Sequence, residues 1–322
     1  MKIAIIGCGN IGLKRVQSII KDKSCKINFI VGRLNPRSES DLIGKKVAKK
    51  INCEYTRDRK KVLNSNIDAV ILSTHPQCFK KIGGEILKAK KHLLIEKPLG
   101  LKKSDAIFLT KLAKKNELIL KTGFNLRFDD GIKKAKYLLE SNKLGKIYFM
   151  KISYVNGSVK TNKNNIGALL DIGSHSINLF EHFFNTKPKV ADIHIQSNEY
   201  HKDDNGFMLL KHKNILCSIH FSFVRWENQF FMEISGEKGF ITIESLPKWG
   251  KQTVTLGKRK YPSGKPKKQH WNFFKDNSWY NEWIYFKKCI IEQNNQNLEE
   301  GLLNMSCIDQ IKRKLTSNEK IS

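Results

Sequence analysis

The sequence predicts an α/β protein. Its first part is predicted to be a Rossmann domain with a doubly wound parallel sheet, and its second part an α+β domain with a mostly antiparallel open sheet. Residues 2–12 combine an apolar run, the glycine spacing G-x-G-x-x-G and an amphipathic stretch. Short apolar runs then alternate with helix-length segments, as in parallel sheets. After about residue 123 the apolar runs become longer and alternate with polar residues, so we expect domains at 1–123 and 124–322.

The glycine motif follows the predicted strand Ile3–Ile6 and precedes a predicted helix. This strand, turn and helix context indicates a dinucleotide-binding turn. We expect Gly7 to permit the tight turn, Gly9 to let the backbone approach a pyrophosphate, and Gly12 to let the helix pack closely. The helix N-terminus would offer free N–H groups and a positive dipole end to the phosphates. A glycine turn in another kind of α/β protein is the alternative.

The first domain is predicted to contain five parallel strands with helices between them, one of them at 104–115. The predicted strands are Ile3–Ile6, Ile27–Val31, Asp68–Ser73, His92–Ile95 and Leu118–Lys121. Such sheets bind their ligands beyond the carboxyl ends of the strands. Residues just after those ends are therefore candidates for binding and chemistry.

The second domain is predicted to contain longer strands that alternate polar and apolar residues. They are Ile147–Val155, Val190–Gln196, Gly206–Leu210, Ile215–Phe223, Phe230–Ser235 and Phe240–Ile243. Helices are expected at 132–141 and 167–184, the second covering part of the sheet. Residues 257–268 are expected to form a basic loop. Trp279, Trp283, Phe286 and Ile290 recur at helical spacing, which predicts a helix that faces a core.

Composition limits the function classes. The 322 residues carry a net charge of +29, but the lysines are spread along the chain without a nucleic-acid motif, so we expect no nucleic-acid partner. The charge would favour an anionic cofactor or substrate. The seven cysteines are scattered without a C-x-x-C pair, which fits a reducing cytoplasm. No apolar run approaches the length of a membrane span, and the opening strand leaves no room for a signal peptide.

Two groups of residues could perform chemistry. Glu96 and Lys97 stand at the end of a predicted strand, before Pro98, where the alternative is a salt-bridged strand end. Asp171 and His175 are four residues apart in a predicted helix, so they share one face. A histidine is the natural acid or base at neutral pH, and a lysine can stabilise a developing alkoxide. An ordinary helix-face pair is the alternative. We find no spacing typical of a metal site.

Five motifs occur in a fixed order along nearly the whole chain. They are G-C-G-N-I-G at 7–12, I-E-K-P-L at 95–99, G-F-N-L-R-F at 123–128, G-A-L-L-D-I-G-S-H at 167–175 and I-S-G-E-K-G at 234–239. In this order the chain resembles the glucose–fructose oxidoreductase, inositol dehydrogenase and rhizopine-catabolism family (Gfo/Idh/MocA).

The resemblance implies a catalytic trio of Lys97, Asp171 and His175. Lys97 would orient the reacting hydroxyl, and His175, supported by Asp171, would accept and donate its proton. The resemblance also implies a cis bond before Pro98 and hydride transfer between nicotinamide C4 and a sugar or polyol carbon. Many members are dimers or tetramers, so a homodimer or homotetramer is expected.

Binding residues are expected at the strand ends and in these motifs. The expected cofactor-binding residues are Gly7, Gly9, Asn10, Ile11, Gly12, Arg33, Ser73, Thr74, His75, Glu96 and Lys97. The expected substrate-binding residues are Lys97, Asn125, Arg127, Asp171 and His175.

Two departures from the family pattern concern the cofactor. Residues 31–35 read V-G-R-L-N, without the acid that often binds the ribose 2′-hydroxyl, whereas Arg33 has the fork that suits a 2′-phosphate. We therefore favour NADP slightly over NAD. The usual T-P-x-x-x-H loop appears as T-H-P-Q-C-F at 74–79.

Three functions stay open at this stage. The first is an NAD(P)-dependent oxidoreductase acting on a sugar or sugar nucleotide. The second is a redox-neutral enzyme whose tightly bound cofactor oxidises and re-reduces one sugar. The third is a non-catalytic nucleotide- or sugar-binding regulator, against which the combination of Lys97, Asp171 and His175 argues.

Overall fold

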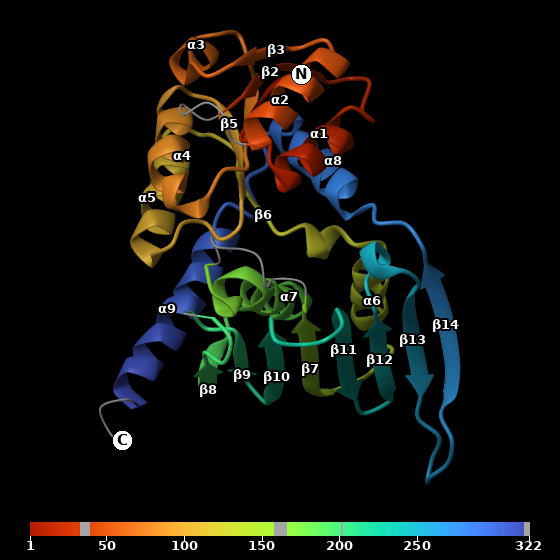
Figure 1. The fold of residues 1–322 in the computed structure, drawn as a ribbon. Coiled ribbons are helices and arrows are strands. Elements are labelled where there is room, and N and C mark those ends of the chain that lie inside the picture. The colour runs from red at the N-terminus through yellow and green to blue at the C-terminus, as the bar shows by residue number, and fades with distance from the viewer. Residues whose placement is uncertain (33–38, 158–165, 201, 319–322) are drawn as a thin grey trace. The chain divides into compact units, whose positions relative to one another are not determined.

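The computed structural model describes residues 1–32, 39–157, 166–200 and 202–318, and they form two compact units (Figure 1). The first unit comprises residues 1–124 and 279–305. The second comprises residues 125–278 and the segment that begins at 306. None of the helices in the described ranges is both long and apolar enough to cross a membrane.

The first unit contains a six-stranded parallel sheet with the order β3-β2-β1-β4-β5-β6. The strands are β1 (Lys2–Ile6), β2 (Lys26–Val31), β3 (Glu54–Thr56), β4 (Ala69–Leu72), β5 (His92–Glu96) and β6 (Leu120–Gly123). Beyond the first residues of β1 and β5, the residues of β1, β4 and β5 are buried, which explains their apolar runs. The order reverses between β1 and β4, and a doubly wound sheet binds its ligands at such a reversal.

Helices connect these strands. They are α1 (Asn10–Ile19), α2 (Glu39–Lys50), α3 (Arg59–Leu63), η1 (Pro76–Cys78), α4 (Phe79–Lys88) and α5 (Lys103–Lys115). The predicted α/β class and parallel sheet are confirmed. The short strand β3 was not predicted, because its three residues Glu54–Thr56 are too few to show a period.

The chain returns to the first unit near its end. Residues 279–305 contain most of α8 (Ser278–Ile291) and the start of α9 (Glu300–Asn318). Trp283 and Phe286 of α8 are buried in the same core cluster as β1 and α1. The Trp283 indole donates to Asp22 Oδ2 at 3.1 Å. We expected residues 279–305 to pack with the second domain; this apolar stripe instead completes the core of the first unit.

The second unit contains an eight-stranded sheet with the order β14-β13-β12-β11-β7-β10-β9-β8. All neighbours are antiparallel except β7 and β10. The strands are β7 (Ile147–Val155), β8 (Lys189–Gln196), β9 (Asn205–His212), β10 (Ile215–Ser222), β11 (Gln229–Gly236), β12 (Gly239–Glu244), β13 (Gln252–Lys258) and β14 (Lys267–Phe273). The predicted mostly antiparallel sheet is confirmed.

Helices cover one face of this sheet (Figure 1). The helix α6 (Asp130–Glu140) packs on β12 and β13, and α7 (Ser174–Phe184) packs on β10 together with a π-helical turn, η3 (Leu169–Gly173). Short 3-10 turns lie at η2 (Asn125–Phe128) and η4 (Pro247–Trp249). Along β7, Met150, Ile152 and Tyr154 are buried, whereas the alternate residues Phe149 and Lys151 are exposed.

Two local features of the second unit differ from expectation. The helix predicted over 167–184 has nearly the predicted extent, but its first part is the π turn η3, and the regular α-helix α7 begins at Ser174. Residues 257–268 are not a single loop, because 257–258 end β13 and 267–268 begin β14. Five lysines and an arginine in this stretch hide the strand pattern, and only 259–266 connect the two strands.

Candidate functional site

The glycine turn after β1 has the geometry that its sequence predicts. Gly7 has a φ of +92°, a conformation that residues with a Cβ rarely adopt. A Cβ on Gly12 would collide with the Gly7 carbonyl oxygen, so only glycine lets α1 approach the turn this closely. The Ser73 hydroxyl donates to the same oxygen at 2.7 Å and fixes the turn to the end of β4.

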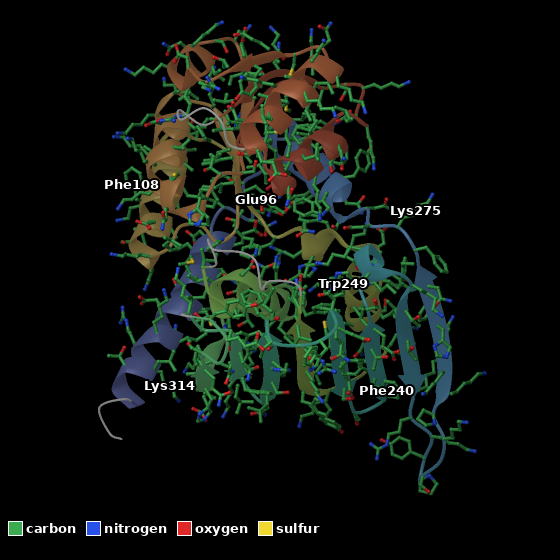
Figure 2. All side chains as sticks on the ribbon, in the orientation of Figure 1. Glu96, Phe108, Phe240, Trp249, Lys275 and Lys314 are labelled. Carbon is green, nitrogen blue, oxygen red and sulfur yellow. The ribbon has the colours of Figure 1, made fainter. Side chains whose placement is uncertain are left out.

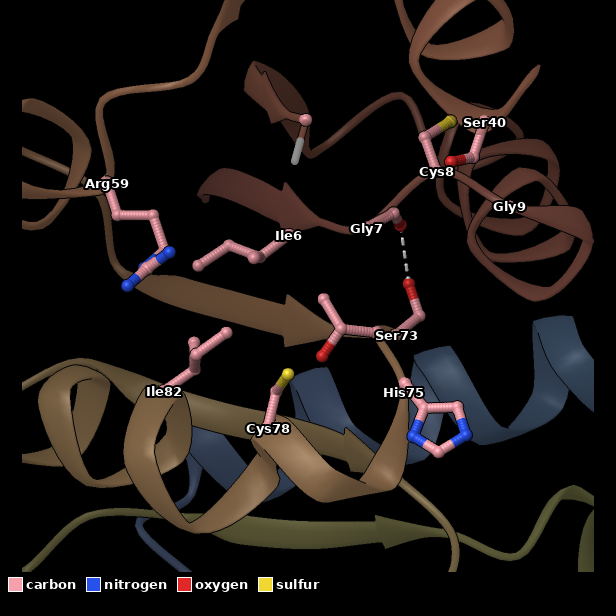
Figure 3. A pocket seen from close by; sticks show the side chains of 12 residues that line it. Ile6, Gly7, Cys8, Gly9, Ser40, Arg59, Ser73, His75, Cys78 and Ile82 are labelled. Atoms are coloured by element: carbon pink, nitrogen blue, oxygen red, sulfur yellow. Dashed lines mark hydrogen bonds between the residues drawn. The ribbon is translucent and has the colours of Figure 1, made fainter. Parts of the chain in front are cut away.

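A cavity of about 320 Å³ opens at this turn (Figure 3). The side chains and backbone that line it are Ile6, Gly7, Cys8, Gly9, Gly32, Ser40, Arg59, Ser73, Thr74, His75, Cys78 and Ile82. A Cβ on Gly9 would meet no atom within 4 Å, so a ligand can approach the backbone there. Gly9 caps α1, whose first N–H groups have no intrahelical acceptor. These features fit the pyrophosphate of a dinucleotide.

Several predicted cofactor residues meet at this cavity, namely Gly7, Gly9, Ser73, Thr74 and His75. Asn10 and Ile11 begin α1 and are exposed. His75 caps η1, since its Nδ1 accepts from the Gln77 N–H at 3.4 Å. Glu96 and Lys97 are not among the residues that line the cavity.

Seven of the twelve lining residues are not among the predicted cofactor-binding residues: Ile6, Cys8, Gly32, Ser40, Arg59, Cys78 and Ile82. In Figure 3, Arg59 and Ile82 lie at one end of the cavity and His75 at the other. Arg59 begins α3 and its Nε donates to Glu85 Oε2 at 3.2 Å. The sequence signal for the start of α3 is Asp58, a typical N-cap residue that directly precedes Arg59. Because the short strand β3 was not predicted, Arg59 was not recognised as a residue that follows a strand end.

Beyond β2, a buried carboxylate stands beside Gly32. Asp41 accepts hydrogen bonds from the Tyr55 hydroxyl and, at 2.6 Å, from the Arg57 guanidinium. These two bonds lower the pKa of Asp41 to about 2. This acid is therefore ionised and engaged by protein donors. Arg33, the predicted 2′-phosphate ligand, lies outside the described residues.

Glu96 belongs to a buried ion network. Its carboxylate lies 2.6 Å from the Arg15 guanidinium of α1, and Arg15 also pairs with Glu282 of α8. Arg15, Glu96 and Glu282 are 1%, 8% and 0% exposed. Burial raises the pKa of Glu282 to about 7, against the opposing effect of Arg15. At Glu96 the structure therefore shows the alternative considered from the sequence, a strand end held by a salt bridge.

Lys97 follows directly and is half-buried, and the peptide bond between Lys97 and Pro98 is cis, as the family resemblance implied. Nearby in the first unit, Lys121 of β6 pairs with Glu300 of α9 at 2.6 Å, and both are buried.

The second unit places Asp171 and His175 on consecutive helical turns over the sheet. Asp171 lies in the π turn η3 and is half-buried, while His175 is in the first turn of α7 and only 7% exposed. A π turn widens a helix and is often found at functional sites. The Ser174 hydroxyl donates to the Leu170 carbonyl at 2.8 Å, which ties the start of α7 to this turn.

Tyr154 of β7 stands beside His175. The two ring centroids are 6.1 Å apart. The Tyr154 hydroxyl accepts from Lys248 Nζ at 3.0 Å, and its ring contacts the Trp249 ring at 5.9 Å. Neither Tyr154 nor Lys248 was predicted, because both are far from His175 in sequence.

The two predicted substrate residues of the η2 turn have partners within the second unit. Asn125 Nδ2 donates to the Ser278 hydroxyl at 2.9 Å, and Arg127 lies 3.2 Å from His182 Nδ1. Among the residues that the structure describes, no group of three His, Cys, Asp or Glu side chains could hold a metal ion.

Residues 1–124 match the model of an oxidoreductase family with an NAD-binding Rossmann fold, GFO_IDH_MocA, and residues 132–242 match the C-terminal domain model of the same family. The chain belongs to this family. The resemblance drawn from the five sequence motifs is therefore confirmed, and so is an NAD-binding type of Rossmann fold.

Two relatives illustrate the range of Gfo/Idh/MocA members similar to this chain. A myo-inositol 2-dehydrogenase from Thermotoga maritima is 32% identical over 155 residues, which cover 48% of this chain and 45% of that protein. A dTDP-3,4-didehydro-2,6-dideoxy-α-D-glucose 3-reductase from Saccharopolyspora spinosa is 25% identical over 256 residues, 76% of this chain and 74% of that protein. The chain spans about half the length of the relatives with which it shares 30% identity or more.

Solved structures of the Gfo/Idh/MocA fold match nearly the whole chain. A 3-ketoreductase from Actinomadura kijaniata, in complex with NADP and TDP-benzene, covers 97% of both chains with a TM-score of 0.83 and 17% identity. At this identity the likeness establishes the fold.

Proposed function

We propose that this protein is an NAD(P)-dependent oxidoreductase that transfers a hydride between nicotinamide and a hydroxyl or carbonyl carbon of a sugar or sugar nucleotide. The observation that supports this most directly is the cavity at the glycine turn, where Gly9 leaves room for a ligand beside the free N–H groups of α1. Membership of the Gfo/Idh/MocA family supports the reaction class.

The bound cofactor would accept or donate the hydride. His175 takes the proton from the reacting hydroxyl oxygen during oxidation and returns it during reduction, and Asp171 supports the imidazole. Lys97 donates a hydrogen bond from its ammonium to the same oxygen and stabilises the negative charge that develops on it. Lys97 directly follows the buried Glu96, the last residue of β5.

The proposed roles can be tested with single substitutions. On a substrate found by screening sugars and sugar nucleotides with NADP and NAD, Lys97→Ala and His175→Ala are expected to lower kcat by about 10²–10⁴-fold, as is typical when a proton-transfer group is lost. The Kd for the cofactor should stay unchanged. Lys111→Ala and His194→Ala, which alter exposed residues elsewhere, serve as controls. Turnover at the wild-type level in either site variant would overturn the assignment.

We further propose a modest preference for NADP. The Asp41 side chain beside Gly32 accepts from Tyr55 and Arg57 and is 1% exposed, and this burial leaves a 2′-hydroxyl without the carboxylate as a partner. The Arg33 guanidinium suits a 2′-phosphate. The Kd values for NADP and NAD, measured for the wild type and for Arg33→Ala, test this. Equal Kd values in the wild type, or an unchanged NADP affinity in the variant, would contradict the preference.

We also propose that the protein is a homodimer or homotetramer. The sheet face of the second unit that faces away from the helices carries exposed apolar side chains, with Phe207 at 53% and Leu216 at 43% exposure. A Phe207→Glu variant should run as a smaller species than the wild type in size-exclusion chromatography with light scattering. A wild type that is itself monomeric would contradict this proposal.

A further inference from the structure

Lys248 and Tyr154 meet where two strands of the second unit's sheet end. β7 and β12 are both antiparallel to β11, which lies between them, so β7 and β12 run in the same direction and finish at the same end of the sheet. Tyr154 is the last but one residue of β7, and Lys248 lies in η4, shortly after β12. Figure 2 shows the neighbouring Trp249 at this end of the sheet.

The Lys248 ammonium lies against two aromatic rings. Its Nζ donates to the Tyr154 hydroxyl at 3.0 Å and lies 4.5 Å from the Trp249 ring centroid and 5.4 Å from that of Tyr154. Tyr154 is buried, and its ring also lies near the His175 ring, with 6.1 Å between the two ring centroids. A single side chain therefore separates this ammonium from the proposed proton acceptor.

The charge of Lys248 has no close partner within the described part of the chain, where its ammonium makes no ion pair. Desolvation lowers the pKa of Lys248, and Asp276, Asp171 and Asp129 oppose this only through longer-range charge interactions. An ammonium carries three donors, of which the Tyr154 hydroxyl takes one. Because Lys248 is exposed, its remaining donors can reach a ligand.

We propose that Lys248 is a substrate-binding residue that holds an anionic oxygen of the substrate, supplied by a carboxylate or a phosphate group on the sugar. An anion would give the ammonium the charge partner that these surroundings lack, and a charge-assisted hydrogen bond is stronger than a neutral one. Tyr154 and Trp249 orient the ammonium, and Tyr154 lies between the ammonium and the His175 ring. This inference rests on the proposed function, because it uses the role proposed for the neighbouring His175 as the acid and base at the reacting hydroxyl.

The test compares three sugars that differ in charge: glucose 6-phosphate, glucuronate and glucose. Each is titrated by calorimetry into the NADP-saturated protein. The wild type should bind at least one of the anionic sugars about tenfold to a hundredfold more tightly than glucose, the difference expected for a hydrogen bond to a charged group. Comparing the phosphate with the carboxylate identifies which anion the site takes.

Lys248→Met keeps most of the length of the side chain and removes the charge, so this variant should bind all three sugars with the affinity that the wild type has for glucose. Lys248→Arg should retain most of the selectivity. Lys251→Met, which removes an exposed lysine three residues away, is the control and should behave as the wild type. Quenching of Trp249 fluorescence, isolated by comparison with Trp249→Phe, places the bound anion beside this residue. The thermal midpoint of each variant confirms its folding.

The proposal is overturned if wild type shows no preference for either anionic sugar, if it binds neither, or if Lys248→Met keeps the selectivity. These outcomes are independent of the proposed reaction, because the roles proposed for that reaction fail if either Lys97→Ala or His175→Ala retains turnover at the wild-type level. A protein that oxidises a neutral sugar and loses activity in those two variants would keep its proposed function and lose this one.

Discussion

The Arg15 guanidinium lies 2.6 Å from the Glu96 carboxylate, and the pair joins the helix after the glycine turn to the residue that directly precedes Lys97. This buried contact thereby connects the helix that follows the proposed cofactor-binding turn with the strand that ends just before the proposed catalytic lysine. Glu282 pairs with Arg15 from the other side, so a helix from the end of the chain holds the same guanidinium.

Arg15→Ala should destabilise the fold by about 3–5 kcal/mol, because it would leave Glu96 and Glu282 as buried carboxylates without their cation. The free energy of unfolding in urea measures the effect. Gln17→Ala, at an exposed position of the same helix, is the control. A loss of stability no larger than that of the control would show that the network contributes little.

The pH dependence of stability should reveal Glu282. Its pKa is raised to about 7 in the folded protein, so between its ordinary value of 4.5 and 7 the folded state holds a proton that the unfolded state has released. The contribution of Glu282 to stability is therefore greatest at low pH and falls as pH rises through this window. Thermal midpoints measured from pH 5 to 8 should decline more steeply for the wild type than for Glu282→Gln. Parallel curves would contradict the raised pKa.

Two glycines of one motif should respond differently to the same added methyl group. A Cβ on Gly9 enters open space, so Gly9→Ala should leave the free energy of unfolding within about 0.5–1 kcal/mol of the wild type and weaken cofactor binding. A Cβ on Gly12 meets the Gly7 carbonyl, so Gly12→Ala should destabilise the fold by about 1–3 kcal/mol. Urea unfolding and NADP titration of both variants distinguish the two effects. Unchanged NADP affinity in Gly9→Ala would speak against cofactor binding at this turn.

Trp283 should be essential to the first unit, although it lies near the end of the chain. The side chain is 1% exposed in the core, so Trp283→Ala should reduce the free energy of unfolding by about 3–5 kcal/mol. Ile291→Ala changes a residue of the same helix that is 69% exposed and should have a small effect. Equal effects of the two substitutions would contradict the packing described here.

Local patterns in the sequence were sufficient for the glycine turn and for most strands. The spacing of Gly7, Gly9 and Gly12 encodes backbone geometry within a few residues, and the apolar runs of β1, β4 and β5 reflect burial on both faces. These features need no knowledge of distant residues. The roles proposed for Lys97, Asp171 and His175 stay predictions from the motif resemblance.

Features that depend on long-range packing could not be predicted in this way. The Trp283 stripe showed that α8 faces a core, but the pattern did not say which core. Lys248 reaches Tyr154 across 94 positions of sequence through the order of the strands. The π turn at Asp171 has the same residue types as an ordinary helix, so its widening has no signal in a helical period.

The path of the chain between the two units has a consequence for engineering and for evolution. Because residues 279–305 return to the first unit and residues from 306 leave it again, the backbone passes between the units three times. A fragment ending at residue 124 would lack the α8 side chains that fill its interior, and would expose the Arg15 network to solvent. The nucleotide-binding half is thus not a detachable module. Exchanging it between relatives requires three matched junctions.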